Sequence, residues 1–342
     1  MDDVASLEIL TNIDLLRNPR APIEARRQAA EYLAEHPNMV VLPVIVKALN
    51  DPDYNIRKSA LAVCAHFQSP MTVEALIRVL RERTFSEREE AIRILGKIKD
   101  IRAVLPVSDA LLYSDWMSIR SAAATALGEM GYEEALPALL EGLGDFEAPV
   151  RANVAEALGE IGSEKAVPTL IQSMRHEKGW NIRHMANALA RIGESSMKPL
   201  IGLLAAQDED PALREVVAET LAEIIEKHPT PAKIQASIKL TVDLLVAELP
   251  KRPKSIRSHI ARAVLTRISG VVADQLIEAF ANSDPDIRDQ VAYILGDSKD
   301  PNLNDRLVRA LNVANERVAS GAARVLYFRG LNPRDYGYTG SL

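Results

Sequence analysis

The sequence has few of the residues that form crosslinks or aromatic cores. It contains one cysteine, Cys64, so no disulfide can form within its 342 residues, and this composition fits a reducing compartment. Aromatic residues make up only 4% of the chain, so we expect a core of alanine, leucine, isoleucine and valine. Because Cys64 falls at a core position of an expected helix, we predict a buried packing residue and not a nucleophile.

Long hydrophobic runs are also absent. The longest apolar stretches, such as residues 40–46, are too short to cross a bilayer, and the N-terminus opens with Asp2 and Asp3 and does not resemble a signal peptide. We therefore expect a cytoplasmic protein with no membrane span. A net charge of −6 argues mildly against a polyanion, so nucleic acid is a disfavoured partner.

The sequence lacks the common motifs of catalysis. It has no glycine-rich phosphate loop, CxxC motif or nucleophile elbow. Its six histidines are scattered, and no spacing would place a base beside a nucleophile. We predict that the protein is not an enzyme, with no catalytic residues, no metal ligands and no cofactor.

What the sequence does contain is one pattern that occurs nine times. Residues 119–128 give a clear example, and each copy is anchored by an arginine: Arg26, Arg57, Arg88, Arg120, Arg151, Arg183, Arg214, Arg257 and Arg288. The successive spacings are 31, 31, 32, 31, 32, 31, 43 and 31 residues. A fixed period of this size is typical of a solenoid, in which each repeat packs on its neighbours.

Each copy contains two expected helices. In residues 148–179 the first helix has apolar residues at helical spacing between Val150 and Ile161, and the second opens at Pro168, where a missing N–H costs nothing. We expect glycines to end the first helix, at Gly96, Gly128, Gly159 with Gly162, and Gly296. Neither helix can bury its apolar stripe alone, so the pairs must stack.

The string from Val150 to Leu170, with its copies over about residues 23–328, resembles HEAT-like repeats, in particular the short kind named after phycobilisome (bilin) lyases. The resemblance implies an all-α fold, a right-handed α-solenoid of about nine to ten two-helix repeats with a period of about 31 residues. It also implies that the second helix of each repeat lines the concave face.

The predicted organisation has four parts. Residues 1–22 form an N-terminal capping helix, residues 23–207 form regular repeats 1–6, and residues 208–328 form C-terminal repeats that include an enlarged one at 208–255. The second helix of the enlarged repeat is expected from about Pro231 to Leu249. Residues 329–342 have no helical periodicity, and we expect either a disordered tail or an extended segment that docks on the rest of the protein.

The resemblance implies that the anchoring arginines pair with acidic residues of the adjoining turn and form a ladder between repeats. Four acidic residues precede an anchoring arginine by four positions, so this pairing is plausible here. The predicted structural ladder comprises Arg57, Arg120, Arg151, Arg214 and Arg288 with Asp53, Glu147, Asp210 and Asp284.

Two further rows of residues are candidates for contact with a partner. One is a set of aromatic residues in the turns before the arginine-bearing helices, of which Trp116, Trp180 and Tyr54 are the predicted edge contacts. The other is a polar stripe along the second helices, of mixed sign and beside small residues: Lys47, Arg78, Asp109, Glu141, Gln172, Gln235, Glu278 and Arg309.

These features predict a protein-binding scaffold or adaptor whose partner is a protein or peptide held on the concave stripe, and we favour a monomer. Two alternatives follow from the resemblance alone. One is a bilin lyase or bilin-protein chaperone. The other, weaker one is a metal oxygenase like deoxyhypusine hydroxylase, whose iron is held by several His-Glu pairs, whereas this sequence has one, His176-Glu177.

Overall fold

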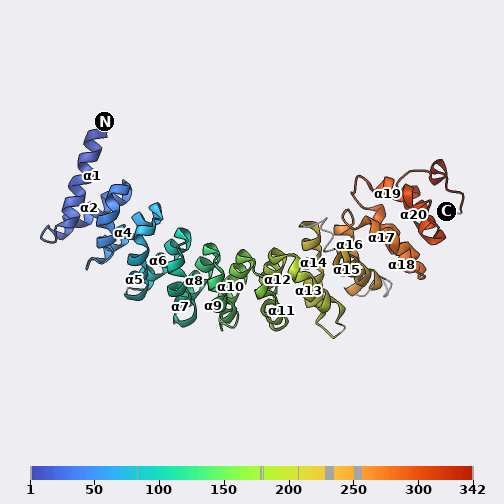
Figure 1. Ribbon diagram of the computed structural model, residues 1–342, viewed down its shortest axis with the longest axis horizontal. Helices are drawn as coiled ribbons and strands as arrows, with labels where there is room; N and C mark the ends of the chain where they lie inside the picture. The colour runs from blue at the N-terminus through green and yellow to red at the C-terminus, as the bar shows by residue number, and fades with distance from the viewer. Residues whose placement is uncertain are drawn as a thin grey trace. The chain divides into compact units, whose positions relative to one another are not determined.

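The computed structural model describes residues 2–82, 84–177, 179, 181–206, 208–227, 235–249 and 256–340. Within these ranges every regular element is helical, so the predicted all-α solenoid is confirmed (Figure 1). Contacts divide the chain into two compact units, residues 1–169 and 170–342. We describe each unit by itself, and the predicted division after residue 207 stays a prediction.

Unit 1 begins with α1 (Asp2–Arg17), which packs against α2 and α3. The helices that carry the anchoring arginines, here called the arginine layer, are α2 (Ile23–Glu35), α4 (Tyr54–Phe67), α6 (Phe85–Ile98), α8 (Met117–Met130) and α10 (Ala148–Ile161). The helices between them, here called the second layer, are α3 (Leu42–Ala48), α5 (Val73–Glu82), α7 (Val104–Tyr113) and α9 (Leu136–Gly142).

Helix α11 (Val167–His176) crosses the boundary into unit 2. Unit 2 continues with α12 (Asn181–Ile192), α13 (Glu194–Ala205), α14 (Pro211–Lys227), α15 (Gln235–Ala247), α16 (Ile256–Ile268), α17 (Ala273–Glu278), α18 (Pro285–Gly296), α19 (Leu303–Ala310) and α20 (Glu316–Phe328). The expected helix from Pro231 to Leu249 is described only as α15, because residues 228–234 lie outside the described ranges. Part of the extra length of this repeat lies in α14, which has 17 residues.

Most second helices of the repeats are preceded by one turn of 3₁₀ helix. In the first five repeats these turns are η1 (Met39–Val41), η2 (Pro70–Thr72), η3 (Ile101–Ala103), η4 (Glu133–Ala135) and η5 (Glu164–Ala166). A polar side chain starts several of them, as where the Asp100 carboxylate accepts from the Arg102 amide at 3.0 Å. In unit 2, η6 (Ala279–Ala281) instead follows α17.

The core between the layers is aliphatic, as the low aromatic content predicts. Leu33, Ile45, Leu76 and Ile119 are fully buried. Cys64 is buried as predicted, and burial raises the pKa of its thiol to about 12, which disfavours the reactive thiolate.

Two of the glycines that were expected to end helices do so, since Gly162 caps α10 and Gly296 is the last residue of α18. Other glycines of the arginine layer have a different role. Gly96 and Gly128 lie inside α6 and α8, whereas α8 and α10 end at Gly131 and Gly162, whose φ angles are 76° and 70°. A Cβ built on Gly128 would lie 2.7 Å from the Cα of Ala157 in α10. Glycine at this position therefore permits the close approach of α8 to α10.

The same contact recurs one repeat earlier, where a Cβ on Gly96 would lie 2.9 Å from the Cα of Ala126. Close glycine–alanine contacts shorten the spacing within the arginine layer, so unit 1 should bend towards that layer. Figure 1 shows this arrangement: α4, α6, α8 and α10 lie on the inner side of the bend of unit 1, and α5, α7 and α9 lie on its outer side.

Residues 329–340 were expected to be either disordered or an extended segment that docks, and they do pack on the rest of unit 2, although not in a fully extended form. They contain η7 (Pro333–Tyr336), whose Pro333 is buried, and η7 packs against α20. The Arg329 side chain holds the start of the segment by donating to the carbonyls of Gly296 and Ser298 at 3.2 and 3.0 Å. Several hydrogen bonds thus fix a segment without helical periodicity.

We predict that Gly128→Ala lowers the free energy of unfolding by about 1–3 kcal/mol, because the new methyl group overlaps the α10 backbone. Gly202→Ala is the matched control: Gly202 lies inside α13 with no atom within 4 Å of its added Cβ, so alanine should be neutral or stabilise by about 0.5–1 kcal/mol. Urea denaturation measures both. Equal effects of the two substitutions would contradict close packing at Gly128.

Candidate functional site

The most regular polar feature is a row of buried arginines that join neighbouring repeats. In unit 1, the Arg120 Nε donates to Asp145 Oδ2 at 2.6 Å and its Nη2 donates to Oδ1 at 3.1 Å. The third nitrogen, Nη1, donates to the carbonyl of Ser114 at 2.9 Å. Arg120 is 3% exposed, so one planar group satisfies the turn of its own repeat and the carboxylate of the next.

Arg57 makes the same set of bonds with a different carboxylate. Its Nε and Nη2 donate to Glu87 at 2.6 and 3.4 Å, and its Nη1 donates to the carbonyls of Asp51 and Pro52. Arg26 pairs with Asp51, and in unit 2 Arg214 pairs with Glu248 at 3.3 Å. In these four pairs the acidic residue therefore lies 25 to 34 residues after its arginine in the sequence.

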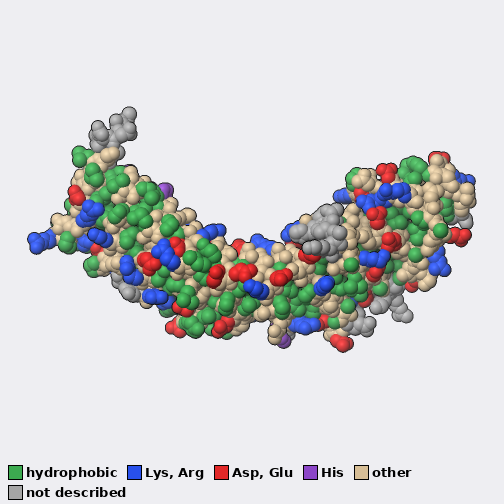
Figure 2. All heavy atoms as spheres, viewed as in Figure 1, with side chains coloured by type: hydrophobic (Ala, Val, Ile, Leu, Met, Phe, Trp, Pro, Cys, Tyr) green, Lys and Arg blue, Asp and Glu red, His purple; other side chains and the backbone are tan. Residues whose placement is uncertain are grey.

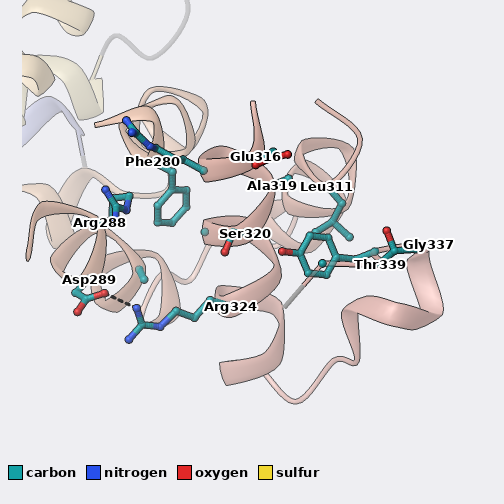
Figure 3. A pocket seen from close by; sticks show the side chains of 15 residues that line it. Phe280, Arg288, Asp289, Leu311, Glu316, Ala319, Ser320, Arg324, Gly337 and Thr339 are labelled. Atoms are coloured by element: carbon teal, nitrogen blue, oxygen red, sulfur yellow. Dashed lines mark hydrogen bonds and ion pairs between the residues drawn. The ribbon is translucent and has the colours of Figure 1, made fainter. Parts of the chain in front are cut away.

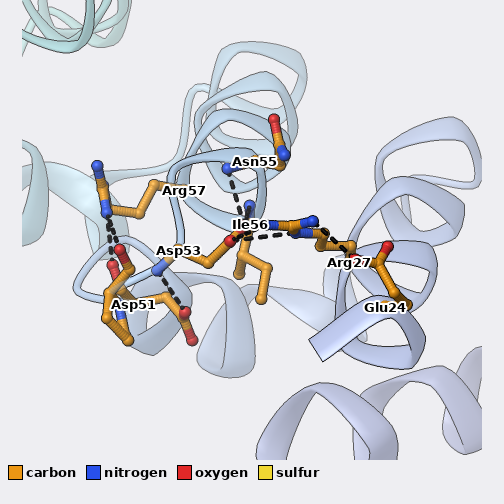
Figure 4. Close-up of polar contacts among 8 residues, drawn as sticks. Glu24, Arg27, Asp51, Asp53, Asn55, Ile56 and Arg57 are labelled. Atoms are coloured by element: carbon orange, nitrogen blue, oxygen red, sulfur yellow. Dashed lines mark hydrogen bonds and ion pairs between the residues drawn. The ribbon is translucent and has the colours of Figure 1, made fainter. Parts of the chain in front are cut away.

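The acidic residues that lie four positions before an arginine act differently from the prediction. Asp53 accepts from the amides of Asn55 and Ile56 at 3.0 and 3.2 Å and caps α4, and its other partner is Arg27 of the preceding repeat (Figure 4). Asp210 and Asp284 accept from the amides two residues later, at 2.7 and 2.9 Å. An acid four residues before the arginine stands at the helix start, where free amide groups attract its carboxylate.

The remaining predicted ladder residues behave in the same way: the arginines bond to their own turn, and the acid stands at a helix start. Arg151 donates to the carbonyls of Asp145 and Phe146, and Arg288 donates to those of Asn282 and Ser283. Glu147 is the N-cap residue of α10, and its side chain makes no capping bond. For Arg57, Arg120 and Arg214 the structure therefore corrects the partner to an acid of the following repeat.

Two carboxylates of this network have a pKa below the ordinary value of their residue type. The hydrogen bond from Arg27 lowers the pKa of Asp53, helped by the Ile56 amide. For Glu87, which is 2% exposed, burial alone would raise the pKa, but hydrogen bonds from Arg57 and Thr84 and the charge of Arg57 outweigh it and lower the pKa. Both groups therefore favour the charged, paired form.

The edge aromatic residues lie at the surface where they are described. Tyr54, Trp116 and Phe146 are 45%, 57% and 77% exposed, and Trp180 lies outside the described residues. The guanidinium of Arg120 lies 4.4 Å from the ring centre of Phe146 in the next turn. Phe146 therefore takes part in the contact between repeats while keeping most of its surface open.

The polar stripe is exposed throughout, but its predicted location on a concave face is wrong for unit 1. The four unit 1 members, here called the outer stripe, lie on second-layer helices: Lys47, Arg78, Asp109 and Glu141. Figure 1 shows α5, α7 and α9, which carry the last three, on the outer side of the bend. The cause is the close glycine–alanine packing of the arginine layer, which puts that layer inside. In unit 2, Gln172, Gln235, Glu278 and Arg309 are also exposed, and Glu278 pairs with Lys239 at 2.5 Å.

The inner side of unit 1 carries a hollow of about 400 Å³ that the sequence reasoning missed. We call it the inner groove, and its polar lining comes from α6, α8 and α10: Glu89, Arg93, Lys97, Thr125, Glu129 and Asn153. Small residues of α8, including Ser121 and Ala122, lie between these longer side chains and leave the space open. The available signal was the spacing of four residues from Glu89 to Arg93 to Lys97.

The groove surface is of mixed charge. Arg93 pairs with Glu89 and, at 3.7 Å, with Glu90 on its own helix. Figure 2 shows acidic and basic side chains interspersed with hydrophobic ones over the visible face of unit 1. A surface that follows a nucleic-acid backbone would carry a run of basic residues. The groove carries charges of both signs, so it suits hydrogen bonds and single ion pairs with a partner better than contact with a nucleic acid.

Two other kinds of site were searched for in the part of the chain that the structure describes. No three His, Cys, Asp or Glu side chains there are grouped so that they could hold a metal ion. None of the described helices combines the length and the apolar character that crossing a membrane requires.

The family described as HEAT repeats matches residues 9–91, 75–150, 104–189 and 138–222. The chain belongs to the HEAT-repeat family, as the repeat pattern predicted. The comparison with curated proteins gave no match.

Solved structures share the fold at low sequence identity. Kap121p bound to Pho4p is 14% identical, with a TM-score of 0.50 over 94% of this chain and 40% of that one. An engineered protein is 19% identical, with a TM-score of 0.46 over 95% and 99%. The CpcE–CpcF complex of phycocyanin lyase from Nostoc sp. PCC7120 is 22% identical, with a TM-score of 0.39 over 66% and 94%. Identities this low describe the fold alone.

The ladder predicts a pH dependence of stability. Because the pKa of Glu87 is lowered in the folded protein from its ordinary value of 4.5, its contribution is complete above that value and is lost as the pH falls through the lower, folded-state pKa. Glu87→Gln should lower the free energy of unfolding by about 2–4 kcal/mol at pH 7, because Arg57 keeps a buried charge without its partner. The difference from the parent should shrink on acidification.

Urea denaturation at pH 7 and at several acidic pH values measures this effect. Glu74→Gln is the control, because the exposed Glu74 pairs with the exposed Arg102 at 3.2 Å and solvent screens such a pair. A constant difference between Glu87→Gln and the parent at all pH values would contradict the assignment.

Proposed function

We propose that this chain is a non-enzymatic protein-binding scaffold, and that the inner groove of unit 1 holds a segment of its partner. The HEAT-repeat fold suits such a role. The observation that carries the proposal is the hollow itself. It follows the exposed faces of three successive arginine-layer helices, so one extended segment can contact several repeats.

The chemistry of the lining supports a polypeptide ligand. Ser121, Thr125 and Asn153 supply neutral donors and acceptors within reach of a peptide backbone, and Lys97 and Glu129 supply one charge of each sign. Such a surface selects a partner by matching charges and excludes segments whose charges clash. The small side chains of α8 leave room for the partner's own side chains.

An aromatic anchor lies beside the groove. Met117 lines the hollow and is 42% exposed, and the preceding residue, Trp116, is 57% exposed. Tryptophan and methionine are enriched in protein interfaces, and a few such residues commonly carry most of the binding energy. This pair adds a large apolar contact at one end of the groove.

The outer stripe is the rival surface, and paired variants separate the two. We predict that Thr125→Arg, which fills the hollow, weakens the partner at least tenfold, while Glu141→Lys on the outer stripe changes affinity less than twofold. Both residues are exposed, so neither substitution should alter the urea midpoint. The partner is first recovered by affinity purification from the native cell, and its dissociation constant is then measured against both variants.

The opposite result, with loss only in Glu141→Lys, would move the contact surface to the outer stripe. A visible absorption band that copurifies with the protein would instead support the pigment-related alternative.

Trp116→Ala should weaken the same partner by about thirtyfold, equivalent to about 2 kcal/mol, as expected for an interface anchor. Tyr293→Ala is the control, because Tyr293 is an aromatic residue of unit 2 that is 60% exposed. Isothermal titration with the purified partner measures both. Equal affinities of the two variants would contradict the prediction that Trp116 contacts the partner.

A further inference from the structure

Arg288 in unit 2 has half of the bonding pattern of a ladder arginine. Its Nη1 donates to the carbonyls of Asn282 and Ser283 at 2.8 and 2.9 Å. Arg57 binds the carbonyls of Asp51 and Pro52 in the same way, five and six residues before it. The guanidinium of Arg288 is therefore held by its own turn in the orientation that the ladder uses.

The other half of the pattern is missing. Arg26 and Arg120 pair with acids 25 residues later, Asp51 and Asp145. The corresponding residue for Arg288 is Val313, which is 45% exposed. Within the described residues no carboxylate forms an ion pair with Arg288, so the Nε and Nη2 edge that binds Asp145 in Arg120 has no acid here.

Arg288 lines a hollow of about 690 Å³. Its walls come from α18, α20 and the segment that follows η7, and they include Arg288, Arg324, Ser320 and Thr339 (Figure 3). Arg324 is neutralised by Asp289. Figure 3 shows Glu316 on the far side of Phe280 from Arg288, and no ion pair joins the two among the described residues.

The hollow has a rigid wall. Phe280 is fully buried, and a Cβ built on Gly321 would overlap the Phe280 ring. The aromatic ring therefore occupies the position that a side chain on α20 would otherwise fill, and it cannot move towards Arg288 without leaving the core. The segment from Gly337 to Gly340 lines the hollow as well, so Arg288 is reached through a defined opening.

Arg88 in unit 1 shows that the lack of an acidic partner does not by itself make an arginine a binding site. Its ladder position also has no ion pair among the described residues, but its Nε is enclosed, with no hydrogen-bond partner. Arg288 differs because it lines a hollow that a side chain can enter.

We infer that this hollow binds an acidic side chain of a peptide, whose carboxylate takes the Nε and Nη2 edge of Arg288 as Asp145 takes that of Arg120. A carboxylate matches the planar fork of a guanidinium in two parallel hydrogen bonds. The inference rests on the proposed function only in that the ligand is a protein segment. The site lies in unit 2, separate in sequence from the inner groove.

The test titrates the full chain with a capped hexaglutamate peptide at low ionic strength by calorimetry. Arg288→Gln should weaken binding at least about tenfold. Val313→Asp should do the same, because the introduced carboxylate would pair with Arg288 and occupy the fork, and this variant should keep or raise the urea midpoint. Arg334→Gln is the matched control: Arg334 is exposed on η7 and outside the hollow, so its loss should change affinity less than twofold.

Three results would overturn the inference. They are no binding of hexaglutamate to the parent chain, equal losses in Arg288→Gln and Arg334→Gln, or binding of inorganic phosphate alone with the same dependence on Arg288. The inner-groove variant Thr125→Arg should leave hexaglutamate binding unchanged, so failure at one site is distinguishable from failure at the other.

Discussion

The interaction on which the repeat stack depends is the buried guanidinium shared between two repeats. Arg120 illustrates it: one edge satisfies the carbonyl of Ser114 in its own turn, and the other edge binds Asp145 in the next. Burying a charge is costly unless every hydrogen bond is made. Because the arrangement satisfies the group only when neighbouring turns are in register, we interpret the ladder as a device that fixes repeat spacing more than one that adds net stability.

Close packing then decides which layer faces inward. The aliphatic core stabilises the packing of the two layers on each other. It does not decide which layer lies on the inner side of the bend, since both layers bury leucine, isoleucine and valine. The distinction comes from Gly96 and Gly128, which let the arginine-layer helices approach each other within ordinary backbone contact. In unit 1 the residues available to a partner on the inner side are therefore the exposed faces of α6, α8 and α10, while the outer stripe faces away from the bend.

Much of this fold could be predicted from the sequence because its information is local and repeated. The arginine period gave the number and order of helix pairs, and apolar spacing gave their buried faces. The ladder partners could not be derived this way. Asp53, Asp210 and Asp284 satisfy the spacing rule equally well as helix caps, and only the folded turn shows that the amides take them. The inner groove was missed for a related reason: the sequence of α8 shows small residues, but not which side of the bend they occupy.

Gly128 shows that a glycine near the end of a helical pattern can have either of two structural roles. A glycine near the end of a helical pattern predicts a left-handed C-cap, and Gly131 does adopt that conformation. Gly128 stands three residues earlier and is helical, so its lack of a side chain serves the neighbouring helix.

A ladder built from shared charges also has a consequence at any repeat whose successor lacks the acid. Its arginine keeps the bonds to its own turn, so it stays ordered, yet one edge of a charged group remains without a partner. In unit 2 Arg288 keeps the bonds to Asn282 and Ser283 of its own turn but receives no carboxylate among the described residues. A guanidinium edge that its own turn holds in place is matched best by a planar anion, so the contact left open at this repeat would favour an acid over a neutral donor or acceptor.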